Sequence, residues 1–242
     1  MLERCAFEAL CVHVRENIMC VRYVRTGSGP GYVAPFSTDN GQSLERLDIY
    51  SPTWNAAPGT RQLVIYPDCI IRSLNWGCRP PGFVPLRLPK IVTSRAENVA
   101  YSPFLKALWR SGRVIVPADS WYEWIGTDDG VRQPYAILPK RSGPLFLAGV
   151  ANLQPDNEAH DDDGFIVITS AARSGLFDVH GRSPLIFAVD AARKWLDPAA
   201  SAREIEDIAR NGAVPAEEFE WFQVSPAVNR VGNDGAELVK PV

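Results

Sequence analysis

Cys20 is the residue whose chemistry depends most on where the mature chain begins, because it directly follows Met19, one of only two methionines. If Met19 is the first residue translated and is then removed, Cys20 carries a free α-amine beside its thiol. Such a 1,2-aminothiol condenses with an aldehyde to a Schiff base, and the thiol then closes a five-membered thiazolidine ring. Inside a longer chain Cys20 has its thiol alone, and an inert, buried cysteine is the alternative.

Two further residues are candidates for proton transfer. Glu123 lies in "DSWYEWIG", where strand alternation predicts that it shares a face with Trp121 and lies opposite Tyr122. A carboxylate desolvated among aromatic rings has a raised pKa, which suits proton transfer near neutral pH; an edge-strand glutamate facing water is the alternative. His180, in "FDVHGRSPLIF", follows one predicted strand and precedes another. It is either a general acid–base or a structural histidine.

Basic residues are concentrated in one part of a mildly acidic chain. The net charge is -3, yet residues 61–115 contain nine Lys or Arg against only Asp68 and Glu97, a difference of +7. Within this stretch Arg95 has the forked guanidinium that suits a phosphate. A local basic face is typical of phosphate binding, whereas scattered solvated arginines and an ordinary Arg95–Glu97 surface pair are the alternatives.

The composition excludes several classes of protein. The chain has 242 residues, 46% of them hydrophobic, without a run of about 18 apolar residues, so we expect no membrane span. Five cysteines without a C-x-x-C pair do not support a zinc site, and free thiols fit a reducing cytoplasm. We therefore expect a cytoplasmic protein with no metal and no organic cofactor.

Strand-forming runs dominate the chain, with a few helices between them. β-branched and aromatic residues bounded by turn residues predict strands at 62–67, 113–125, 133–139, 144–153, 165–170 and 183–189. Helices are expected at 102–112, 189–197 and 201–212 from capping residues and apolar periodicity. These elements predict one α+β domain built on a mainly antiparallel, barrel-like β-sheet with inserted short helices.

Six segments, in order, resemble the SOS response-associated peptidase (SRAP) family of abasic-site processing proteins. "MCVRYV" (19–24) is similar to the family's opening M-C-G-R-[FY], "WNAAPG" (54–59) to Y-N-x-A-P, and "LNWGCRPP" (74–81) to R-W-G-L-I-P. The run at 93–124 resembles N-A-R-x-E-T followed by the block that ends in Y-E-W. The run at 165–187 resembles T-x-x-A-N and H-x-R-M-P, and 222–242 resembles the closing P-V-S-x-x-V-N. The resemblance divides the chain into residues 1–18, a leader, and an SRAP domain over 19–242.

The resemblance implies that the protein binds abasic sites in single-stranded DNA and links to them covalently through an N-terminal cysteine. Carried over by position, Cys20 is the nucleophile, and Glu123 and His180 are acid–base residues. The DNA-binding residues implied are Arg22, Trp76, Arg95 and Arg182, with Trp76 and Trp121 available to stack on bases. We also expect a monomer that is associated with the bacterial nucleoid when bound to DNA.

Three positions depart from the family pattern. Val21 replaces the glycine after the cysteine, and Ser183 replaces the methionine of H-x-R-M-P. Thr93 stands where the family has an asparagine whose amide helps to position the cysteine, so Thr93 is a candidate catalytic residue. Its hydroxyl is shorter than an amide and has one donor instead of two.

The leader leaves two routes to a free Cys20 amine. Translation begins at Met19, which we favour because the resemblance begins there, or the thiol cuts the Met19–Cys20 bond in an autopeptidase reaction. Two other functions stay open: a thiol peptidase that acts on itself or on other proteins, and an SRAP fold that binds DNA without crosslinking.

Overall fold

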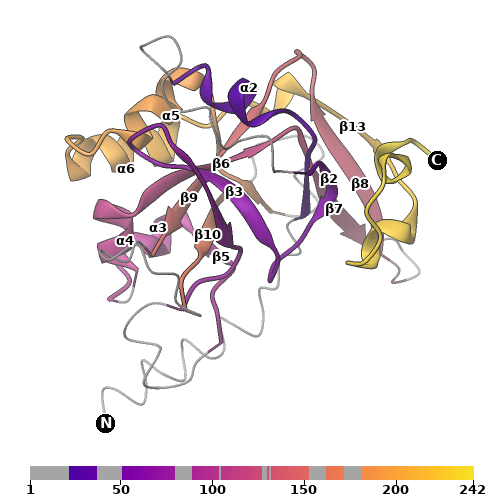
Figure 1. Cartoon of the computed structure of the whole chain (residues 1–242), viewed down its shortest axis with the longest axis horizontal. Helices are drawn as coiled ribbons and strands as arrows, with labels where there is room; N and C mark the ends of the chain where they lie inside the picture. Colours follow the sequence, from indigo (N-terminus) through magenta and orange to yellow (C-terminus); the bar gives the residue numbers. More distant parts are fainter. Residues whose placement is uncertain are drawn as a thin grey trace.

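The computed structural model describes residues 22–36, 51–79, 89–103, 105–126, 130, 132–152, 162–171 and 181–242. The leader expected at residues 1–18 lies outside these ranges. Two sheets pack face to face, with helices over one outer side and the C-terminal turns over the other (Figure 1). The α+β class and the mainly antiparallel pairing are confirmed, but the strands form two open sheets instead of a closed barrel.

The smaller sheet is antiparallel throughout and has the order β13-β8-β7-β1-β2. Its strands are β1 (Arg22–Arg25), β2 (Thr53–Ala56), β7 (Ser120–Gly126), β8 (Arg132–Pro139) and β13 (Phe219–Gln223). Strand β1 of this sheet begins two residues after Cys20, the candidate nucleophile. The same sheet carries Glu123 on the neighbouring strand β7.

The larger sheet has eight strands, in the order β11-β10-β9-β6-β3-β4, with β12 paired to β9 and β5 paired to β10. Its strands are β3 (Arg61–Ile65), β4 (Ile71–Asn75), β5 (Thr93–Arg95), β6 (Arg113–Ala118), β9 (Leu145–Ala151), β10 (Phe165–Ala171), β11 (Arg182–Pro184) and β12 (Ile186–Phe187). The β5–β10 pair is parallel, and the other strand pairs of this sheet are antiparallel.

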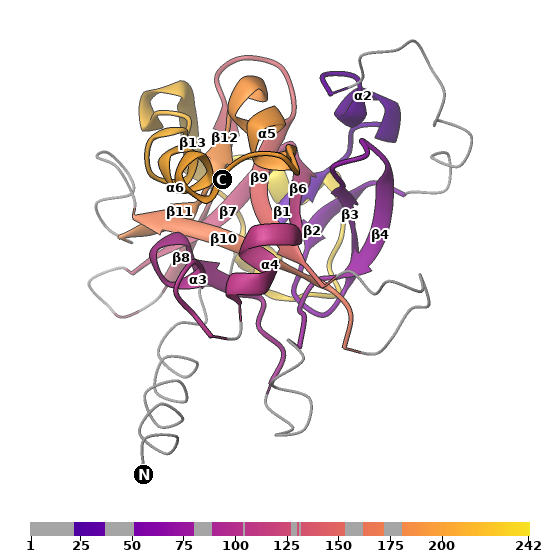
Figure 2. The same cartoon turned by 90° about the vertical axis from the view of Figure 1, so that its left-hand side faces the viewer.

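Short helices complete the described part of the chain (Figure 2). The α-helices are α2 (Gly29–Val33), α3 (Ala96–Val99), α4 (Lys106–Ser111), α5 (Val189–Leu196) and α6 (Ala202–Asn211), and the 3-10 helices are η3 (Ala216–Glu218), η4 (Pro226–Asn229) and η5 (Ala236–Val239). The α6 helix begins with a capping box between Ser201 and Glu204, a motif that stabilises a helix by about 1 kcal/mol. No helix among the described residues is long and apolar enough to cross a membrane.

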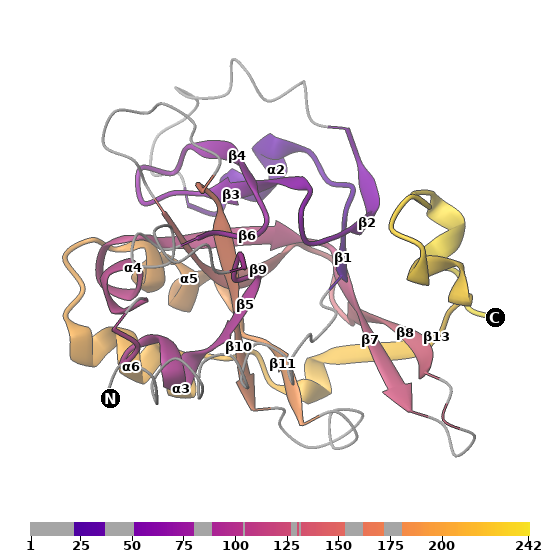
Figure 3. The same cartoon turned by 90° about the horizontal axis from the view of Figure 1, so that it is seen from below.

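Three apolar clusters follow from strand alternation. In β9, Leu145 and Leu147 point into the core between the two sheets, whereas Phe146 and Ala148 point toward the helices. Both faces of this strand are buried, which explains its unbroken apolar sequence. A third cluster, which includes Tyr122, lies on the outer face of the smaller sheet, where η4 and η5 cover it (Figure 3).

Three sequence predictions of element boundaries were wrong. The strand predicted at 183–189 is two short strands, β11 and β12, and Val189 already belongs to α5. The run 113–125 is two strands in different sheets, because the carboxylate of Asp119 accepts hydrogen bonds from Thr26, Gly27 and Tyr32 at the corner between them. The helix predicted at 102–112 begins at Lys106. The backbone amides of Leu105 and Lys106 both donate to the Ser102 carbonyl, at 3.2 and 3.0 Å, so a turn precedes the helix.

Candidate functional site

Glu123 is buried inside the protein, with 4% of its surface exposed. It alternates along β7 with Tyr122, which belongs to the outer cluster, and so shares its face with Trp121, which belongs to the core between the sheets. Its Oε1 atom has no hydrogen-bond partner among the described residues. Burial raises the pKa of Glu123 to about 8, although an interaction with the Trp121 side chain acts in the opposite direction. The predicted desolvation is therefore confirmed, and the carboxyl group is mostly protonated at neutral pH.

Thr93 and Arg95 are positioned by the parallel pairing of β5 with β10. Thr93 lies beside Val167, and Arg95 lies beside Thr169. Neighbouring residues in register share a face of the sheet, and Val167 belongs to the core between the two sheets. Thr93 and Arg95 are thus directed toward the side on which β7 carries Trp121. Both are partly exposed.

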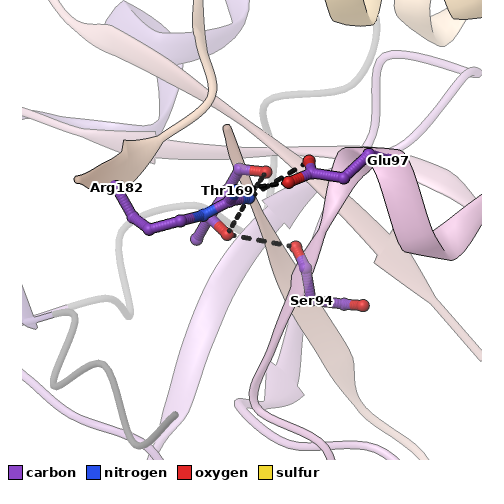
Figure 4. A network of polar contacts seen from close by, with 4 residues as sticks. All are labelled: Ser94, Glu97, Thr169 and Arg182. Atoms are coloured by element: carbon purple, nitrogen blue, oxygen red, sulfur yellow. Dashed lines mark hydrogen bonds and ion pairs between the residues drawn. The ribbon is translucent and has the colours of Figure 1, made fainter. Parts of the chain in front are cut away.

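Arg182 is held by a network that ties four elements together, β11, α3, β10 and β5 (Figure 4). Its Nη1 atom is paired with a carboxylate oxygen of Glu97, which lies in α3. Its Nη2 atom donates to the carbonyl and the hydroxyl of Thr169, at 2.8 and 3.1 Å, and that hydroxyl lies 3.4 Å from the carbonyl of Ser94. Burial is the largest single effect and raises the pKa of Glu97, but the hydrogen bonds and charge of Arg182, a backbone hydrogen bond and the charge of Arg95 together outweigh it, so the net pKa is lowered.

A small cavity of about 30 Å³ lies between the strand that carries Glu123 and the strand that carries Arg182. Its lining includes Trp121 from β7 and Ser183 and Pro184 from β11. Trp121 is two residues from Glu123, and Ser183 directly follows Arg182. The structure therefore brings the strand of the predicted carboxylate close to the strand that follows His180. Gly181, between His180 and Arg182, has a φ of 66°, a backbone conformation that favours glycine.

The prediction that Trp76 and Trp121 stack on bases is wrong. Each exposes only 1% of its surface. The ring of Trp76 lies between those of Tyr23 and Phe165, with centroids 5.2 and 5.9 Å away, and its Nε1 donates to the Val92 carbonyl at 2.8 Å. Both faces of this indole are covered, so it serves as core and offers no surface to DNA.

Asn55, in the "WNAAPG" segment, has a role that sequence reasoning missed. Its side-chain oxygen accepts a hydrogen bond from Arg22 at 2.7 Å, and its nitrogen lies 3.1, 3.1 and 2.9 Å from the carbonyls of Val228, Arg230 and Asn233. Asn55 therefore fastens the C-terminal segment to β1. Arg22 is 8% exposed and takes part in this contact. The predicted phosphate contact of Arg22 stays a prediction. The burial of the Arg22 side chain does not favour such a contact.

The described residues of the basic stretch 61–115 do not form one continuous cationic face. Arg113 is 4% exposed, and its guanidinium donates to the main-chain carbonyls of Trp195 and Asp197 at 2.7 and 2.8 Å. Arg72 pairs with Asp68 at 2.8 Å, and Arg79 pairs with Asp162. Arg113 is thus internal and Arg79 is paired with an acid outside the stretch, while the Asp68 charge is already counted in the +7. The alternative of dispersed arginines fits the described part of this stretch better.

Cys20, Val21 and His180 lie outside the described residues, as do His13 and His160. Within the described ranges, no three His, Cys, Asp or Glu side chains are grouped as they would be around a metal ion. The described part of the site thus consists of a protonated carboxyl group, a threonine and arginines. Such a set can donate protons and hold a phosphate.

Comparison with known proteins gives a family match over most of the chain. The model of the family described as "SOS response associated peptidase (SRAP)" matches residues 19–231. The Abasic site processing protein YedK of Escherichia coli is 35% identical over 231 residues, which cover 93% of this chain and 100% of that protein. The Abasic site processing protein YoaM of Bacillus subtilis is 31% identical, with 78% and 85% covered.

Solved structures agree with this match. The crystal structure of a phage-related protein from Bordetella bronchiseptica superposes with a TM-score of 0.71 at 30% identity, covering 85% of this chain and 94% of that one. A protein from Bacteroides thetaiotaomicron has a TM-score of 0.74 at 17% identity, which supports the fold alone.

Proposed function

Because the chain belongs to the SOS response associated peptidase (SRAP) family, we propose that it processes abasic sites in single-stranded DNA. In this proposal Cys20, as the first residue of the mature protein, captures the sugar aldehyde in a covalent thiazolidine. The observation that carries the proposal is the buried carboxyl group of Glu123 beside the strand to which Cys20 is attached. The names of the relatives supply the substrate class.

Chain length supports Cys20 as the nucleophile. β1 begins at Arg22, which pairs with Tyr122, the neighbour of Glu123 in β7. Two residues span at most about 7 Å, so the Cα atom of Cys20 lies within that distance of the Arg22 Cα atom. The amine and thiol of Cys20 are thus tethered near the buried carboxyl group. His180 is likewise tethered two residues before Arg182.

The proposed reaction has two balanced steps. The neutral α-amine of Cys20 adds to the C1′ aldehyde of the ring-opened sugar, and loss of one water gives a Schiff base. The thiol then adds to the imine carbon while its proton passes to the imine nitrogen, which closes the thiazolidine. The overall reaction releases one water and needs no oxidant, reductant or cofactor.

Glu123 suits the proton transfers of this reaction. With a pKa of about 8 it is largely protonated at pH 7, so it can donate a proton to the oxygen that leaves as water. The α-amine, with an ordinary pKa of about 7.7–8, must be neutral to attack. The protonated acid and the neutral amine are therefore present together to the greatest extent near pH 8. The rate of crosslinking should consequently follow a bell-shaped pH profile with its maximum there.

Arg95, Thr93 and His180 have supporting roles in this proposal. Arg95 is partly exposed on β5 and holds a phosphate beside the lesion through its forked guanidinium. Thr93 shares the face of Arg95 and positions the Cys20 amine or thiol with its hydroxyl. His180 acts as an acid–base in sugar ring opening and in reversal of the crosslink.

We further propose that residues 1–18 are absent from the active protein. The family model begins to match at Met19, which supports translation from that methionine. The family's description as a peptidase supports the second route. In that route the Cys20 thiol attacks the Met19 carbonyl, the bond to the Cys20 nitrogen breaks, and water hydrolyses the thioester. The products are a Met19 carboxylate and a free Cys20 amine.

Incubation of the Met19-start protein with a single-stranded oligonucleotide that contains one abasic site tests the proposal. We expect an adduct that survives denaturing electrophoresis and that Cys20→Ala abolishes. Cys20→Ala and Cys20→Ser both keep the α-amine and lose the thiol, so the Schiff base of either variant should be visible only after borohydride reduction. Stable adducts with Cys20→Ala at the wild-type rate would refute the assigned nucleophile. Salt-sensitive DNA binding without any adduct would favour a family fold that binds but does not crosslink.

A further inference from the structure

A second, larger cavity of about 300 Å³ lies beside the candidate site. It is bounded by α3, by α6 and by the end of β10, and its lining includes Ala96 and Glu97, the two residues that directly follow Arg95. It shares Ser170, Ala171 and Ala213 with the small cavity below Trp121. The two cavities therefore adjoin the same residues around the end of β10.

Tyr101 gives this cavity an aromatic wall that is open to solvent. Its side chain lines the cavity, yet 72% of the residue is exposed, which is unusual for a ring of this size. Small residues, including Ala100 and Ala209, form part of the lining, together with the larger side chains of Trp109, Glu206 and Arg210. The cavity beside Tyr101 is therefore partly apolar and partly charged. The volume is at the lower end of the range for small-molecule sites.

The charges around the cavity indicate a neutral occupant. Glu97 and Glu206 line it, and both carry negative charge that repels a phosphate. Glu97 is paired with Arg182, and Arg210 is the one basic side chain among the residues that line the cavity. A phosphate held by Arg95 would lie next to this rim, and the base of the adjoining nucleotide would be within reach of the cavity.

We infer that the cavity between α3 and α6 receives the nucleobase next to the abasic site, stacked on Tyr101. This inference rests on the proposed function and adds a contact that the lesion itself cannot make, because an abasic nucleotide has no base to stack. Base–aromatic stacking tolerates any sequence. The protein would thus bind strands regardless of which base flanks the lesion.

Fluorescence anisotropy with a tetrahydrofuran analogue of the abasic site measures this contact without crosslinking. Tyr101→Ala should weaken binding about five- to a hundredfold, the loss expected for one stacked base. Tyr101→Phe keeps the ring and should bind like the wild type. Trp221→Ala is the matched control, because Trp221 is also an exposed aromatic residue, at 38%, but lines neither cavity.

Oligonucleotides with one additional baseless spacer identify the nucleobase that stacks on Tyr101. One spacer replaces the nucleotide on the 5′ side of the lesion or on the 3′ side. On one of these two strands the wild type should fall to the affinity of Tyr101→Ala, and the mutation should then have no further effect. The inference is overturned if Tyr101→Ala binds like the wild type, or if its loss persists when both flanking bases are absent.

A parallel incubation with a natural abasic site distinguishes failure of the Tyr101 inference from failure of the proposed function. Wild-type crosslinking together with no effect of Tyr101→Ala would remove this inference and leave the proposed function standing. A wild type that neither crosslinks nor binds would remove both.

Discussion

Glu97 and Arg182 form an ion pair that joins α3 to β11, so the guanidinium predicted to bind DNA already has a carboxylate partner. The Arg182 side chain is 13% exposed, and it also donates to the carbonyl and hydroxyl of Thr169. Arg95, by contrast, is partly exposed on β5 and forms no ion pair among the residues that the structure describes. The two arginines therefore have different expected roles, the first in positioning β11 and the second in binding phosphate.

Arg95→Gln should weaken binding to single-stranded DNA and lower the slope of log Kd against log salt concentration by about 0.7, the value for one lost phosphate contact. Arg182→Gln should leave that slope unchanged. It should instead lower the free energy of unfolding by about 1–3 kcal/mol, because hydrogen bonds to a charged, partly buried group are lost. Anisotropy titrations at several salt concentrations and urea unfolding measure both effects. An equal loss of slope in the two variants would show that Arg182 also contacts phosphate.

Glu123→Gln should change how stability depends on pH. The pKa of Glu123 is about 8 in the folded protein and has an ordinary value of 4.5. Between these values the folded state binds one proton more than the unfolded state, so stability falls as pH rises. The contribution is fully present below the unfolded pKa and is lost as pH rises through the folded pKa. Relative to Glu123→Gln, the wild type should thus lose a few kcal/mol between about pH 4.5 and pH 8.

Urea unfolding of wild type and Glu123→Gln at matched pH values tests this expectation. Both proteins share every other titrating group, so the difference between their free energies of unfolding isolates Glu123. Parallel curves over the whole range would mean that the carboxyl group is ionised normally in the folded protein, and the role of Glu123 as a proton donor would then be untenable.

Thr93→Asn should accelerate crosslinking by about fivefold, since a second amide donor adds one hydrogen bond of about 1 kcal/mol at the reacting cysteine. Thr93→Val keeps the shape but removes the hydroxyl, and we expect it to slow the reaction by a similar factor. Single-turnover kinetics with abasic DNA measures both rates. If all three proteins react equally fast, position 93 does not act on Cys20.

Asn55→Ala should lower the free energy of unfolding by about 2–4 kcal/mol, because it removes the hydrogen bonds that the Asn55 side chain makes to the Arg22 guanidinium and to carbonyls of the C-terminal segment. Asn211→Ala is a suitable control, since Asn211 is exposed and bonds only to Asp207 within α6. Its cost should be below about 0.5 kcal/mol. Similar midpoints in urea for the two variants would contradict the fastening role of Asn55.

Much of the fold was predictable because local signals agreed with the tertiary structure. The runs that became β3, β8, β9 and β10 are rich in residues that suit a pleated surface, and α5 and α6 end within one residue of their predicted limits. The corner at Asp119 was missed because its cause is non-local. The carboxylate bonds to Thr26 and Gly27, about ninety positions earlier in the chain, and nothing in the apolar pattern reveals such a contact.

The site was predictable where alternation decides burial and unpredictable where packing across sheets decides it. The position of Glu123 beside Trp121 follows from a period of two along one strand. The burial of Trp76 depends on Tyr23 and Phe165, which arrive from other strands. Exposure of Tyr101 likewise depends on the path of the chain after α3, so an aromatic residue that the quoted family patterns do not single out became the better candidate for stacking.

Intact-mass measurement of the denaturation-resistant adduct tests the central claim most directly. The adduct should be prepared both from the full 242-residue chain and from the Met19-start protein. From the Met19-start protein we expect a mass equal to the protein that begins at Cys20 plus the DNA minus one water, and the full chain should give this mass only where its thiol has cut the Met19–Cys20 bond. A stable adduct whose protein part retains residues 1–19 would contradict the account, because Cys20 would then have no free amine with which to close the ring.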